Sequence, residues 1–100
     1  MNYTLRDVLR KYTGYDLECE ISKVEGIGDG FYNIELFHVN STKKSISSFS
    51  TIPIPKGSIY FSGIVMIKNG KIFVHAQYVG RIPLNNIEKK LLNYIDVFIR

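Results

Sequence analysis

The stretch IYFSGIVMIK (residues 59–68), NG (69–70) and KIFVHAQYV (71–79) decides the fold. β-Branched and aromatic residues fill both flanks, and such residues favour strands. The Asn69-Gly70 pair between them is typical of a type I′ turn, because both central residues of that turn need positive φ. We therefore expect two long antiparallel strands joined by a two-residue turn. Gly63 predicts a bulge or a sharp bend in the first of them.

Length and composition fit one small domain spanning residues 1–100, without repeats or a linker. The single cysteine, Cys19, cannot form an internal disulfide, and we expect it to be buried in a strand. No hydrophobic run reaches the roughly 20 residues that span a bilayer, and the N-terminus lacks a signal-peptide core. These features predict an intracellular protein, cytoplasmic or nuclear in a reducing compartment, with no membrane partner. The net charge of +4 mildly favours an anionic partner.

Helical signals stand at both ends of the chain. Thr4 and Asp7 form a capping-box pattern, and Gly14 is a plausible C-cap, so we expect an N-terminal helix within residues 1–14. After Pro83, Asn85 is the expected N-cap of an amphipathic helix at residues 84–99. Its apolar stripe comprises Leu84, Ile87, Leu91, Leu92, Ile95, Phe98 and Ile99.

Three further strands are expected between the first helix and the hairpin. Residues 15–24 and 31–39 alternate between apolar and polar side chains, and a serine-rich third strand covers residues 44–52. Pro53 and Pro55 are expected to break the sheet, since neither can donate a ladder hydrogen bond.

The order helix, five strands, helix predicts an all-β domain with flanking helices. We expect a five-stranded Greek-key barrel of the OB type over residues 15–82, because this architecture combines five strands with the sharp bends that Gly63 suggests. An SH3-like barrel is the alternative, since a count of strands does not separate the two.

Motifs for catalysis or for a cofactor are absent from the sequence. His38, His75 and Cys19 do not have the spacing of metal ligands, and the two histidines are read as solvated strand residues. The glycine-rich loop at residues 26–30 lacks the frame of a phosphate-binding loop and is not followed by a helix. We therefore expect no enzyme, no catalytic or metal site and no cofactor.

The whole-chain layout resembles OB-fold proteins, above all the smallest subunit of replication protein A and its telomeric counterparts. The resemblance rests on the helix that ends at Gly14, the strand at residues 16–24 with its glycine-rich loop, the segments 59–65 and 76–79, and the C-terminal helix. It implies a non-enzymatic subunit that joins a larger OB-fold protein through the C-terminal helix, with some contribution to single-stranded DNA binding. The loop at residues 68–71 is shorter than the one with which strong single-strand binders clamp their ligand.

Two functional hypotheses follow from these features. The first is a small accessory subunit of a DNA replication or repair complex that stabilises a larger protein partner. The second is a free-standing protein that binds single-stranded nucleic acid weakly. Whether the C-terminal helix packs on its own barrel or on a partner stays open.

Candidate residues for each hypothesis come from the strand and helix patterns. Nucleic acid would be bound by aromatic platforms and nearby cations: Phe31, Phe37, Phe49, Lys43, Lys44 and Lys68. A protein partner would be bound by the outer side chains of the hairpin and by the C-terminal helix: Tyr60, Ile64, Met66, Ile87, Leu91, Ile95 and Phe98.

Overall fold

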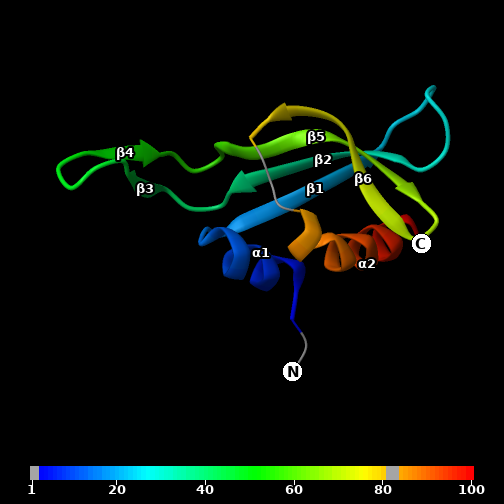
Figure 1. The fold of residues 1–100 in the computed structure, drawn as a ribbon, viewed down its shortest axis with the longest axis horizontal. Helices are drawn as coiled ribbons and strands as arrows, with labels where there is room; N and C mark the ends of the chain where they lie inside the picture. Colours follow the sequence, from blue (N-terminus) through cyan, green and yellow to red (C-terminus); the bar gives the residue numbers. More distant parts are fainter. Residues whose placement is uncertain (1–2, 81–83) are drawn as a thin grey trace.

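A four-stranded antiparallel sheet lies across two helices in the computed structural model, which describes residues 3–80 and 84–100 (Figure 1). The elements are α1 (Leu5–Thr13), β1 (Leu17–Lys23), β2 (Phe31–His38), β3 (Thr42–Ser45), β4 (Thr51–Ile54), β5 (Ile59–Lys68), β6 (Lys71–Val79), a 3₁₀ turn at Leu84–Asn86 and α2 (Glu88–Ile99). The chain is therefore mostly β, with one helix near each end, as the sequence predicts.

Local signals place the first helix and the hairpin as expected. The Asp7 N–H donates to the Thr4 hydroxyl at 3.2 Å, and the Thr4 N–H donates to the Asp7 carboxylate at 3.0 Å, which completes the capping box. Gly14 ends α1 in the left-handed region. Asn69 and Gly70 both have positive φ, 53° and 72°, so the two-residue turn between β5 and β6 is confirmed.

The predicted start of the second helix is wrong by one turn. Asn85 lies in the 3₁₀ segment, and α2 begins after Ile87, whose side chain makes no capping hydrogen bond. Burial of Ile87 in the core therefore positions this helix, rather than a polar cap.

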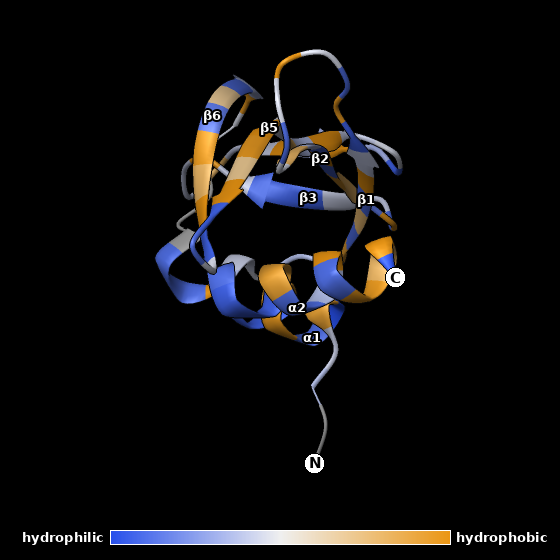
Figure 2. Cartoon of the chain, turned by 90° about the vertical axis from the view of Figure 1, so that its right-hand side faces the viewer, coloured by the Kyte–Doolittle hydropathy of each residue, from blue (hydrophilic) through white to orange (hydrophobic). Residues whose placement is uncertain are grey.

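The expected closed Greek-key barrel is not formed. The strand order is β1-β2-β5-β6, so each strand pairs only with neighbours along this meander, and no pairing joins β1 to β6 within residues 3–80 and 84–100. A closed barrel needs its two edge strands to pair, and here the sheet stays open. The two helices cover the face that a barrel would enclose (Figure 2).

The predicted strand at residues 44–52 is also wrong, because its serine-rich centre turns the chain back. The Ile46 N–H donates to the Ser50 carbonyl at 3.1 Å, and the two halves pair as β3 and β4 in a separate ribbon. Pro53, expected to break the sheet, lies inside β4 opposite Lys43. It is tolerated there because each strand of a two-stranded ribbon has a free edge, where the missing N–H is not needed.

Gly63 lies at an irregularity of the hairpin, as expected. The register of β5 against β6 shifts on both sides of it, between Ser62 and Gly63 and between Ile64 and Val65. A Cβ atom at this position would come within 2.5 Å of the Ala76 carbonyl oxygen, so only glycine allows this close approach. The bulges increase the local twist, and this bends the sheet over the helices.

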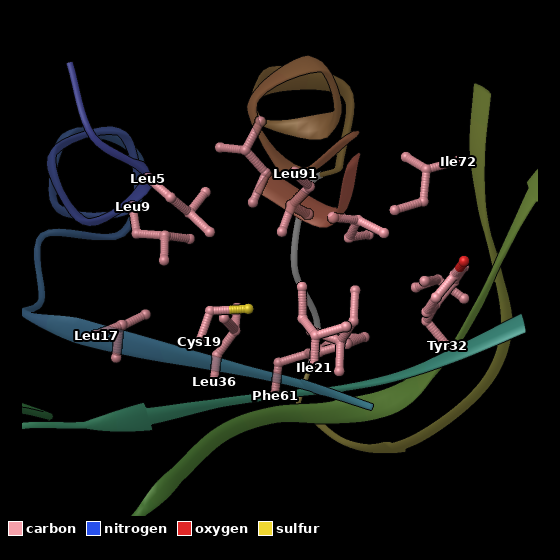
Figure 3. Packing of buried hydrophobic residues seen from close by; sticks show 14 residues of the cluster. Leu5, Leu9, Leu17, Cys19, Ile21, Tyr32, Leu36, Phe61, Ile72 and Leu91 are labelled. Atoms are coloured by element: carbon pink, nitrogen blue, oxygen red, sulfur yellow. The ribbon is translucent and has the colours of Figure 1, made fainter. Parts of the chain in front are cut away.

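The core lies between the inner face of the sheet and the helices, and Figure 3 shows its side chains pointing toward one another across this layer. Its members are Leu5, Leu9, Leu17, Cys19, Ile21, Tyr32, Ile34, Leu36, Phe61, Val65, Ile72, Ile87, Leu91 and Ile95. Burial raises the pKa of the Cys19 thiol to about 12, so this cysteine is an inert core residue, as expected.

The C-terminal helix packs on its own sheet, which answers the question that the sequence left open. Three of the candidates for binding a partner are buried in the core and have no exposed surface for a contact: Ile87, Leu91 and Ile95. Phe98, the fourth candidate on this helix, is 54% exposed.

The burial of α2 predicts unequal effects of two truncations on stability. Ile95→Ala should lower the free energy of unfolding by about 2–5 kcal/mol, because it leaves a cavity in the core. Phe98→Ala should lower it by less than about 1 kcal/mol, because the side chain is largely solvated. Urea denaturation of both variants measures the difference, and equal losses would contradict this packing.

Candidate functional site

The outer face of the sheet, opposite the helices, carries an apolar patch. Phe31 of β2 pairs with Met66 of β5, which pairs in turn with Phe73 of β6, and Ile64 lies one pleat away on β5. We call Phe31, Ile64, Met66 and Phe73 the outer patch. Phe73 is 46% exposed and the other three are partly exposed. The described part of the chain places no helix over this face (Figure 1).

The histidine of β6 borders the outer patch. A register shift makes His75 the extra residue on β6, and its ring meets the Phe31 ring edge-on, with centroids 5.0 Å apart. His75 is exposed, as the sequence predicts. The patch therefore has a polar, hydrogen-bonding group at its margin.

Acidic side chains occupy the other half of the outer face. Glu20 of β1 lies directly opposite Glu35 of β2, and Glu18 lies opposite Phe37. These carboxylates repel the phosphates of a nucleic acid, so Phe37 is poorly placed as a platform for its bases. The acidic half instead gives the outer patch a charged rim on one side.

Tyr60, expected to share a face with Ile64 and Met66, does not lie with them. A register shift between Leu36 and Phe37 leaves Tyr60 as the extra residue on β5. Its ring packs 6.0 Å from Tyr15 and 6.1 Å from His38, measured between centroids. Tyr60 therefore forms an aromatic cluster with Tyr15 and His38 and is not part of the outer patch.

His38, expected to be solvated, is buried within that aromatic cluster. Its ring meets Tyr15 edge-on at 5.0 Å between centroids. Burial lowers the pKa of His38, because desolvation penalises the imidazolium. Within the described residues, no group of three or more His, Cys, Asp or Glu side chains could hold a metal ion.

The ribbon of β3 and β4 projects beyond the sheet as an arm, residues 42–54 (Figure 1). It continues the β2–β5 ladder, since the His38 N–H donates to the Ser58 carbonyl and the Gly57 N–H donates to the His38 carbonyl, both at 2.8 Å. The Lys56 N–H also donates to the Ser41 hydroxyl at 3.2 Å. These bonds anchor the base of the arm, and the molecule extends 48 Å along its longest axis against 35 and 21 Å along the others.

The six residues predicted to bind nucleic acid do not meet in one place. Phe31 and Lys68 lie toward the β5–β6 turn, and Phe37 lies six residues further along β2, about 20 Å away by strand geometry. Lys43, Lys44 and Phe49 lie on the arm. The last three form the only group of these candidates that combines an exposed aromatic ring with cations on one element.

One signal in the sequence was missed by residue-by-residue reading. Between Glu35 and Glu88 the chain contains six Lys or Arg residues and no Asp or Glu. This acid-free span includes the whole arm and the β5–β6 hairpin, whereas α1, β1 and β2 hold seven of the nine acidic residues with their connecting loops. The span between Glu35 and Glu88 therefore carries uncompensated positive charge, whereas residues 1–35 hold seven acids against four Lys or Arg residues.

A cavity of about 480 Å³ opens between the β5–β6 turn and α2. Tyr32, Ile67, Leu92 and Ile95 form its apolar walls. The rim carries Lys89, Asn93 and Asp96, and Asp96 is ion-paired with Arg100 at 2.8 Å. The walls suit a small apolar group, but no set of polar atoms converges on the interior to orient one.

Comparisons with protein-family models, with curated proteins and with solved structures found no match to this chain. The resemblance to the small subunit of replication protein A therefore stays a prediction from the sequence. In the described part of the chain, none of the helices has the length and apolarity to cross a membrane.

The buried His38 predicts a loss of stability at mildly acidic pH. The unfolded chain takes up a proton near the ordinary pKa of 6.5, whereas the folded chain resists it, so the free energy of unfolding should fall as the pH drops from 7 to 5. His38→Phe keeps the aromatic packing and should flatten this dependence. The lowered pKa of Asp7 acts only below its ordinary value of 3.8, outside this window. Urea titrations at several pH values measure both slopes, and parallel curves would contradict the burial of a neutral imidazole.

Proposed function

We propose that this protein is a non-enzymatic accessory subunit that binds a larger protein partner through the outer patch. The observation that carries the proposal is the contiguous, partly exposed row of Phe31, Met66 and Phe73 on a sheet face without a covering helix. Apolar side chains clustered on one face favour removal from water by association.

The surroundings of the outer patch support a protein as its ligand. An apolar centre with a polar rim is the usual anatomy of a protein interface. Glu20 and Glu35 supply the rim on the β1 side, and His75 supplies a donor or acceptor on the β6 side. The same acidic residues disfavour a nucleic acid at this surface.

The two edge strands differ in how open they are to a partner. On β1, the Tyr94 hydroxyl donates to the Cys19 carbonyl at 3.5 Å, and Glu18 and Glu20 add charge along the edge. On β6, Phe73 and Val79 are exposed beside an edge with no paired strand in the described residues. A partner that covers the outer patch would therefore extend over β6, and its backbone could pair with the regular part of that strand.

The setting of DNA replication or repair belongs to the same proposal. It rests on the resemblance of the chain to small OB-fold subunits, carried by the segments 59–65 and 76–79 and the two helices. The open sheet removes the closed barrel from that resemblance, whereas the order of helix, strands and helix remains.

Replacing an outer-patch residue by an acid should abolish partner binding without unfolding the chain. Phe73→Glu places a charge in the apolar contact, and we expect at least a tenfold loss of a stoichiometric partner captured from native extract. Val97→Glu, on the exposed side of α2, is the matched control and should retain the partner.

Circular dichroism and the melting temperature show whether both variants stay folded. Capture that is equal for the wild type and Phe73→Glu would contradict the proposal. So would a homodimer in light scattering that Phe73→Glu converts to a monomer, because the patch would then be covered by a second copy.

A further inference from the structure

We propose that the arm and its base form a separate nucleic-acid-binding element, in which Phe49 stacks on an unpaired base and Lys43, Lys44 and, at the base, Lys56 contact backbone phosphates. This inference concerns a different surface from the outer patch and does not depend on the protein partner. It assigns the positively charged arm to a polyanionic ligand, a single-stranded nucleic acid.

Phe49 is presented at the tip of the arm with 99% of its surface exposed. The turn that carries it is held by backbone bonds, since the N–H groups of Ile46 and Ser47 both donate to the Ser50 carbonyl. The Phe49 N–H donates to the Ser47 hydroxyl at 3.3 Å. A fully solvated phenyl ring contributes nothing to the core, whereas its open face can stack on any base.

Hydrogen-bond donors and positive charge lie along the ribbon behind this ring. Strand alternation places Lys44 with Ile52 on one face of the ribbon, and Lys43 with Pro53 on the other. A strand that crosses the tip therefore meets a cation on either face. Hydroxyl groups, which bind phosphate oxygens, fill the rest of the ribbon end: Ser45, Ser47, Ser48, Ser50 and Thr51.

The absence of acidic residues from the sequence between Glu35 and Glu88 completes the electrostatic argument. The arm itself has no carboxylate, so the charges of Lys43 and Lys44 add along the ribbon. At its base, the Asp16 carboxylate accepts a hydrogen bond from the Asn40 amide at 3.1 Å, and its charge is paired with Arg10. The carboxylates of β1 and β2 lie on the sheet, from which the arm projects away (Figure 1).

A lipid surface is a poorer occupant for this tip. Ile46 and Ile52 are exposed beside Phe49, but the turn between them also carries hydroxyls and backbone groups that hydrocarbon cannot satisfy. A single-stranded nucleic acid offers phosphates for the hydroxyls and lysines, and its bases can reach the ring without being unstacked from a duplex.

Three phosphate contacts and one stacked base imply weak, salt-dependent binding. A slope of about −0.7 per contact gives a log–log salt dependence of about −2, so a fourfold rise in salt should weaken binding by roughly 20-fold. We expect micromolar or poorer affinity at physiological salt, with little sequence preference. DNA and RNA single strands share the chemistry, and a comparison of the two tells which is preferred.

Fluorescence anisotropy with labelled oligothymidylate and oligouridylate tests the arm directly. Combined Lys43→Glu and Lys44→Glu changes should weaken binding at least tenfold, whereas Lys23→Glu with Lys89→Glu, the same charge change away from the arm, should weaken it far less. Phe49→Ser should weaken binding about tenfold and leave the salt slope unchanged, because stacking releases no counterions.

Three outcomes overturn the inference: equal losses in the two double variants, no loss in Phe49→Ser, or tighter binding to duplex DNA or anionic vesicles than to single strands. The exposed positions of all these side chains predict unchanged melting temperatures, which separates a binding defect from unfolding. Phe73→Glu should bind oligonucleotide like the wild type, so failure of the outer patch and failure of the arm are distinguishable.

Discussion

One-sided burial of the sheet is the constraint on which the rest of this structure depends. Inward side chains of β1, β2, β5 and β6 pack on α1 and α2, and this single layer contains the described core. Because the helices occupy the inner face, the sheet does not need to close into a barrel to bury its apolar residues. The outer face is left with its own apolar row, and that row is where a partner can contribute the burial that the chain does not supply.

The antiparallel pair of β2 and β5 links this layer to the arm. Its inner residues Ile34 and Phe61 are held in the core, and its ladder runs on through His38 to the base of the ribbon. A ribbon anchored in this way can present Phe49 at a distance from the sheet without a core of its own. The charge distribution follows the same division, since acids gather on β1, β2 and the loops beside them while cations without acids extend through the arm.

Much of the fold could be predicted from short-range signals, whereas long-range closure could not. The Asn69-Gly70 turn and the capping box at Thr4 depend on neighbouring residues only, so the sequence determines them locally. Barrel closure depends on which strands pair at the edges of the sheet. The number and order of predicted strands do not determine that pairing. The serine-rich segment after Lys44 has the alternation of a strand, and its turn is decided by pairing with residues beyond Ser50.

The candidate surfaces were predictable to a similar extent. Strand alternation placed Ile64 and Met66 on the outer face correctly, but it failed at Tyr60, where a register shift that no residue pattern marks reverses the alternation. An apolar stripe on a helix does not indicate whether the helix packs on a partner or on its own sheet. The sequence therefore predicted a partner contact for Ile95, which lies in the core. Phe49 was identified as a candidate, but its isolation on a projecting arm required the fold.

Solvent paramagnetic relaxation of methyl groups tests the one-sided burial most directly. With a soluble gadolinium chelate, the methyl groups of Ile64 and Met66 should relax several-fold faster than those of Val65 and Ile34, because the first pair faces solvent and the second faces the helices. Equal, slow relaxation of all four residues would contradict the account, since it would mean that both faces of the sheet are covered, as in a self-associated form.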